Sequence, residues 1–149
     1  MNKLIVAAAI GIAFGTQAFA AADYGVAKDA EAMVQKAVKH FNSAGKDKAF
    51  ADFSTPAWVD RDVYIVVLDF NGVVVAHGTN AKLIGKDMMS AKDPDGVAFT
   101  AAMVDSAKSK GKGWTDYKFT DPATKKVLPK ASYCEKAGDF AICAGIYKR

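Results

Sequence analysis

The chain has 149 residues, of which 51% are hydrophobic and 24% are charged, and its formal net charge is +4 at pH 7. This length supports one domain with its own hydrophobic core, since two ordinary domains would need a longer chain. Lysines alternate with acidic residues along the chain instead of forming a basic block, so the composition argues against a nucleic-acid-binding protein.

Residues 1–22 have the pattern of a secretory signal peptide. One lysine precedes an apolar run over 4–14, and small residues follow it. We expect cleavage after Ala20 or Ala22. The alternative is an uncleaved membrane anchor, which the shortness of the run disfavours because a bilayer span takes about 20 apolar residues. The mature protein, residues 23–149, is then exported, and the expected compartment is a bacterial periplasm.

Helical spacing recurs in three segments of the mature chain. Apolar residues three or four positions apart predict an amphipathic helix over 26–41, which the segment 42–45 ends. A short second helix is expected over 47–53. A third helical pattern covers 97–110 and stops at Gly111.

The remaining regular pattern is that of β-strands, rich in β-branched and aromatic residues. Five strands are expected, over 63–68, 73–77, 114–119, 126–136 and 140–147. Asn71-Gly72 joins the first two as a hairpin. Residues 78–96 form a polar connection long enough to suggest a functional loop. Hairpin-linked strands and a long first helix predict an α+β domain of the PAS-like kind, with a central antiparallel sheet of about five strands.

The last two strands each carry one cysteine. If Gly138-Asp139 is the two-residue turn between them, Cys134 lies directly opposite Cys143. Two opposed thiols in an oxidising compartment are expected to form a disulfide, and the alternative is a pair of buried free thiols. The chain contains no CxxC motif, so the cysteine spacing does not indicate a redox role.

The sequence contains no recognisable nucleophile with a neighbouring base, metal-ligand cluster or phosphate-binding loop, so it indicates neither an enzyme nor a metal or cofactor site. Several polar and aromatic residues nevertheless stand in the strands where apolar ones would suffice, which is typical of a small-molecule pocket. They are His77, Trp114, Tyr117, Lys130 and Tyr133. Lysine and histidine donors would suit a carboxylate. The alternative is that the aromatic residues belong to the core and that Lys130 is a surface charge.

Side-chain parity bears on this pocket. Lys130 and Tyr133 are three positions apart, as are Trp114 and Tyr117, and residues three apart in a regular strand point to opposite faces. Each pair reaches one pocket only if a bulge, a bend or a strand end intervenes.

Three segments together resemble the single Cache domains, which are extracytoplasmic ligand-sensing modules of bacterial chemoreceptors and histidine kinases. They are DVYIVVLDFNGVVVAHGTNAKLIGKD, KDPDGVAF and GKGWTDYKFTDPATKKVLPKASYCEKAGDFAICAGIY. The resemblance covers about residues 23–147. It implies a PAS-like fold with a pocket for small organic molecules, often short carboxylates, on one face of the sheet. The residues matching that pocket are His77, Phe99, Trp114, Tyr117, Lys130 and Tyr133.

The expected function is therefore that of a periplasmic sensor domain that binds a small organic anion and acts through a separate membrane histidine kinase or chemoreceptor. The alternative is a structural protein that docks on a membrane partner without a ligand. A response of thermal stability to a metabolite panel separates the two, because only a ligand that binds the folded state raises the melting temperature.

Overall fold

Two helices begin the part of the chain that the computed structural model describes, residues 24–149. They are α1 (Ala27–Ala44) and α2 (Lys46–Phe53), close to the predicted bounds. The predicted signal peptide lies outside the described residues. Within residues 24–149, no helix has both the length and the apolarity that a bilayer crossing requires.

One antiparallel sheet follows, as predicted. Its strands are β1 (Val59–Asp60), β2 (Val63–Asp69), β3 (Val74–His77), β4 (Lys112–Thr120), β5 (Val127–Ala137) and β6 (Phe140–Tyr147). They lie in the order β1-β2-β6-β5-β4, and β3 also pairs with β2. The two-residue β1, which follows the 3-10 helix η1 (Pro56–Trp58), is the strand that the sequence pattern missed, since two residues are too few to show a period.

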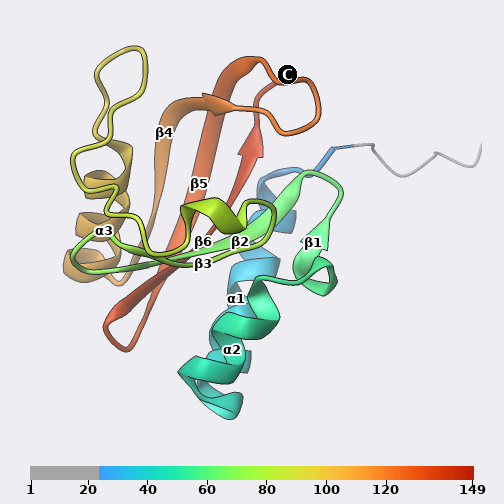
Figure 1. Cartoon of the computed structure of the whole chain (residues 1–149), viewed down its shortest axis with the longest axis vertical. Helices are drawn as coiled ribbons and strands as arrows, with labels where there is room; N and C mark the ends of the chain where they lie inside the picture. Colours follow the sequence, from blue (N-terminus) through green and yellow to red (C-terminus); the bar gives the residue numbers. More distant parts are fainter. Residues whose placement is uncertain (1–23) are drawn as a thin grey trace, which may run out of the picture.

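The two faces of the sheet carry separate cores, and helices lie on both sides of the sheet (Figure 1). On one face, Ile65 of β2 and Ile142 of β6 pack against α1 and α2. On the other, Leu68 of β2 and Cys143 of β6 pack against α3 (Phe99–Lys110). Because side chains alternate along a regular strand, parity separates the two faces in β5 and β6. In β3 the register shift opposite Val67 and Leu68 breaks this rule, so that Val74 packs on the α3 face and Ala76 on the α1 face.

The connection before α3 folds back over the α3 face instead of extending into solvent. It contains the 3-10 helix η2 (Ala81–Leu83), and its backbone pairs with the chain around β3: Gly85 N–H donates to the Val74 carbonyl at 2.7 Å and Met88 N–H to the Gly72 carbonyl at 2.9 Å. Gly72 is required here, because a Cβ on it would stand 2.8 Å from the Met89 Cβ. The connection therefore forms a second wall beside α3.

The cysteine prediction is confirmed. Ala137 pairs with Phe140 across the turn, and Cys134 pairs with Cys143 with a Cα–Cα distance of 4.1 Å and a disulfide between them. Gly138 has a φ of +57°, the left-handed conformation for which glycine is favoured. The turn chemistry thus determines the register that brings the two sulfurs together.

Replacing both cysteines with alanine is expected to destabilise the protein without unfolding it. A closed loop of about ten residues restricts the unfolded chain by roughly 2.5 kcal/mol, which corresponds to a fall in melting temperature on the order of 10 °C. Scanning calorimetry of the Cys134→Ala/Cys143→Ala variant measures this loss. Detection of two free thiols in the unreduced wild-type protein, by mass after alkylation, would contradict the bridge.

Candidate functional site

A cavity of about 50 Å³ lies between the α3 face of the sheet, α3 itself and the connection before it. Apolar side chains make most of its wall: Val66, Leu68, Val74, Leu83, Met88, Phe99, Met103 and Phe119. Polar groups come from Tyr64, His77, Thr100, Tyr117, Lys130 and Ser132. An apolar wall with a few convergent polar groups is the usual composition of a small-molecule site.

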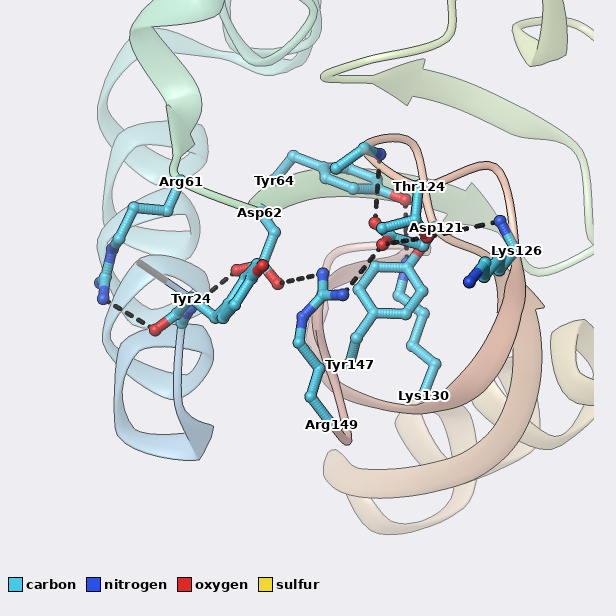
Figure 2. Close-up of polar contacts among 12 residues, drawn as sticks. Tyr24, Arg61, Asp62, Tyr64, Asp121, Thr124, Lys126, Lys130, Tyr147 and Arg149 are labelled. Atoms are coloured by element: carbon cyan, nitrogen blue, oxygen red, sulfur yellow. Dashed lines mark hydrogen bonds and ion pairs between the residues drawn. The ribbon is translucent and has the colours of Figure 1, made fainter. Parts of the chain in front are cut away.

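Lys130 is the one cation among the described residues lining this cavity, and its side chain is 3% exposed. Its Nζ donates to Tyr64 Oη at 2.8 Å and to Tyr147 Oη at 3.3 Å (Figure 2). The same Nζ lies 4.6 Å from the centre of the Tyr64 ring and 4.7 Å from that of Tyr147. Tyr147 Oη in turn donates to the Thr120 carbonyl at 2.8 Å. Aromatic rings and phenol oxygens therefore surround the ammonium.

The charge of Lys130 has no carboxylate partner in residues 24–149, since every ion pair found there joins other side chains. Burial by itself would lower the pKa of Lys130, but the hydroxyls of Tyr117, Tyr64 and Tyr147 outweigh burial and hold this pKa above its usual value. The ammonium thus stays protonated. A buried charge is ordinarily paired, so this one is available to an anion.

Gly145 makes room for the lysine. It lies opposite Ser132 in the β5–β6 ladder, two positions along from the pair Lys130 and Tyr147. A Cβ on Gly145 would stand 2.6 Å from Lys130 Cε and 2.5 Å from Ser132 Oγ. Glycine at this position therefore leaves room for the lysine side chain against β6.

Tyr117 and Phe99 form the next part of the wall. Their rings stack with centroids 4.9 Å apart, and Tyr117 Oη shares a hydrogen bond of 2.9 Å with Ser132 Oγ. Burial raises the pKa of Tyr117, so the phenol stays protonated at neutral pH. Either hydroxyl of this pair can donate to an anion beside Lys130.

His77 lies at the end of β3 and is buried. Its Nδ1 accepts hydrogen bonds from the backbone N–H groups of Thr79 at 3.2 Å and Asn80 at 3.0 Å. In the neutral imidazole the proton therefore resides on Nε2. Burial, and next the charge of Lys130, lower the pKa of His77 to about 4. At neutral pH His77 is an uncharged donor.

Acidification is expected to destabilise the fold through His77. Between its ordinary pKa of 6.5 and its folded value of about 4, the unfolded chain binds a proton that the folded protein does not. The contribution of neutral His77 to the free energy of unfolding is therefore fully present above pH 6.5. It falls by about 2–3 kcal/mol as the pH approaches 4. Urea unfolding at several pH values measures the slope. His77→Gln should remove this component, whereas His40→Gln should keep it, and an unchanged slope in His77→Gln would contradict the assignment.

The structure does not bring Trp114 and Tyr133 to the cavity. The β4–β5 ladder is regular, with Trp114 opposite Tyr133 and Tyr117 opposite Lys130, so no bulge reunites residues three apart. Trp114 and Tyr133 share the α1 face with ring centroids 5.4 Å apart, and Trp114 Nε1 donates to Glu31 of α1 at 3.2 Å. Of the six predicted pocket residues, four lie on the cavity: His77, Phe99, Tyr117 and Lys130.

Tyr64 lines the cavity and Tyr147 contacts Lys130 directly, and neither was among the residues predicted from the sequence. A signal for Tyr147 was present, since extending the hairpin register from the cysteines pairs Tyr147 with Lys130. Tyr64 had no such signal, because the pairing of β2 with β6 joins segments far apart in sequence.

Comparison with known proteins places this geometry in a family. The model of the family described as single Cache domain 2 matches residues 21–147. The methyl-accepting chemotaxis protein McpP of Pseudomonas putida is 30% identical over 90 residues, which are 59% of this chain and 16% of that protein. The chain thus spans less than a fifth of the length of that relative.

Two solved structures share the fold. A methyl-accepting chemotaxis protein from Vibrio parahaemolyticus matches with a TM-score of 0.70 and 24% identity, over 80% of this chain and 86% of the other. A Cache chemosensory domain, whose structure is described as the basis for carboxylic acid recognition, matches with a TM-score of 0.70 and 26% identity, over 82% of this chain and 92% of the other.

Proposed function

Because the chain belongs to the single Cache domain 2 family, we propose that it is an extracytoplasmic sensor domain that binds a short organic monocarboxylate beside Lys130. The observation that carries this proposal is the buried ammonium of Lys130, which faces a cavity and pairs with no carboxylate of the described residues. A bound carboxylate would complete the missing ion pair. The described carboxylic acid recognition by a similar Cache domain supports the same ligand class.

The polar groups suit one carboxylate at one end of the cavity. Lys130 Nζ has a third N–H beyond the two that it gives to the tyrosines, and the Tyr117–Ser132 pair and His77 Nε2 add neutral donors. Phe99 with the other apolar wall residues would cover the tail. No second cation lines the cavity within residues 24–149, so a second carboxylate would be buried without a partner. The site therefore favours monocarboxylates.

The cavity volume limits the ligand. A cavity of about 50 Å³ favours small ligands of the size of acetate or propionate. With a ceiling of about 1.5 kcal/mol for each non-hydrogen atom, four or five atoms give at best a micromolar to tens-of-micromolar Kd.

We place this function in the periplasm, with residues 1–22 removed as a signal peptide and residues 23–149 as the domain. The Cys134–Cys143 disulfide supports an oxidising compartment. Because its relatives are chemotaxis receptors, the domain acts as a sensor without catalysis and reports its ligand to a membrane chemoreceptor or histidine kinase.

The test is calorimetric titration of the purified protein with acetate, propionate, butyrate and succinate, and with propionamide as a neutral ligand of the same shape. Propionate or acetate should bind and raise the melting temperature, while propionamide and succinate should not. Equal binding of propionate and propionamide would contradict recognition by charge. A flat response to every monocarboxylate at tens of millimolar would favour the alternative of a docking protein without a ligand.

A further inference from the structure

A second hollow of about 490 Å³ opens next to the cavity. We call it the vestibule. Thr79 and Lys82 bound it on the η2 side, and Thr120, Pro122 and Lys125 bound it on the side of the β4–β5 hairpin loop. Four residues line both the vestibule and the cavity and so form a neck between them: Tyr64, His77, Leu83 and Phe119.

We propose that the vestibule is the route by which the anionic ligand reaches Lys130, and that Lys82 and Lys125 at its rim attract the ligand and set its association rate. This proposal rests on the proposed function. Lys130 is 3% exposed, so a ligand cannot reach it from solvent without passing a wall. The shared neck joins the vestibule to the cavity that Lys130 lines.

The charge of the vestibule has a single sign. Lys82 and Lys125 are both exposed, and no Asp or Glu is among the described residues that line the hollow. A concave surface with charge of one sign concentrates counter-ions and raises their association rate, more strongly at low salt. The vestibule therefore has the electrostatics of a funnel for small anions.

Lys125 is held at this rim in an unusual conformation. Its φ of +61° lies in the left-handed region, which is uncommon for residues other than glycine, asparagine and aspartate. The loop keeps it there: Lys125 N–H donates to the Asp121 carbonyl and Asp121 N–H to the Lys126 carbonyl, each at 2.8 Å. Unfavourable backbone conformations persist where the surrounding structure enforces them, often at functional sites.

Asp121 and Arg149 fix this loop to the rest of the domain (Figure 2). The Asp121 side chain is 0% exposed and accepts hydrogen bonds from Thr124 Oγ1 at 2.8 Å and from Arg149 at 3.0 Å. Arg149 also donates to Asp62 at 3.3 Å, next to β2. The hydrogen bond from Arg149 lowers the pKa of Asp121 to about 2, so the pair stays charged at neutral pH. Lys125 is thus presented by a fixed loop.

The experiment measures the kinetics of propionate binding by NMR line-shape analysis at low and high ionic strength. The Lys82→Gln/Lys125→Gln variant should lower kon roughly three- to tenfold at low salt, change koff less than about twofold, and approach the wild type at high salt. The matched control is Lys110→Gln/Lys112→Gln, which removes the same charge from exposed positions that do not line the vestibule. Its kon should stay within about twofold of the wild type.

A second variant tests the route independently of charge. Lys125→Cys carrying a bulky maleimide should slow both kon and koff on the order of tenfold, while Lys110→Cys with the same label should not. Propionate binding with unchanged rates in both vestibule variants would overturn the route and leave the proposed function standing. Absence of binding to the unmodified protein would overturn the proposed function, and this inference with it.

Discussion

Replacing Lys130 with methionine is expected to abolish most carboxylate binding and to lower the stability of the ligand-free protein moderately. Removing one partner of a buried, hydrogen-bonded ion pair costs about 2–5 kcal/mol, which is a loss of affinity of about thirtyfold or more. Methionine keeps the apolar stem across Gly145, but it removes the donor to Tyr64 and Tyr147, and the loss of a hydrogen bond to a charged group costs about 1.5–3 kcal/mol. Calorimetric titration and a thermal melt measure the two effects.

The Lys130→Met test is specific when the variant remains folded at the titration temperature and no longer binds propionate. Lys112→Met, at an exposed position on β4, serves as the control and should alter neither quantity. If ligand-free Lys130→Met were unfolded at the titration temperature, Lys130 would be a structural residue. Unchanged affinity would place the anion site elsewhere.

Truncating Ile142 to alanine is expected to lower the free energy of unfolding by about 2–5 kcal/mol. Ile142 is 0% exposed and packs on the α1 face in one cluster with Val34 of α1 and Ile65 of β2. The loss combines the removed apolar contacts with the cost of the cavity that remains, because the sheet and α1 cannot fully close the space that the side chain leaves. Urea unfolding, monitored by circular dichroism, measures this change.

Ile84→Ala is the matched control, because Ile84 has the same side chain with 39% exposure and lies outside both cores. Its effect should stay below about 1 kcal/mol. A similarly small loss for Ile142→Ala would mean that α1 contributes little to the core on that face.

The order of the elements was predictable because each one depends on neighbouring residues. Glycine at 138 and aspartate at 139 specify the turn, the turn specifies the register, and the register brings Cys134 opposite Cys143. The apolar patterns that predict α1 and α3 likewise each lie in a single segment of the chain. Short strands such as β1 escaped notice, because their pairing depends on a partner and not on their own composition.

The pocket was predictable only in part. Parity assigns Tyr117 and Lys130 to one face of the sheet and Trp114 and Tyr133 to the other, provided that the strands are regular. The sequence alone left open whether a bulge interrupts them. The ladder from β4 to β5 has no bulge, so the two groups separate.

The sequence by itself determined the α+β class, the family resemblance, the disulfide and four residues that line the cavity. Only the tertiary structure decided that Lys130 is buried and not a surface charge. That outcome depends on Tyr64, brought to the lysine by the pairing of β2 with β6, and on Gly145, which leaves the space. Burial of a charge is a property of the neighbours that surround it, and most of these neighbours come from distant parts of the chain that meet only when the sheet closes.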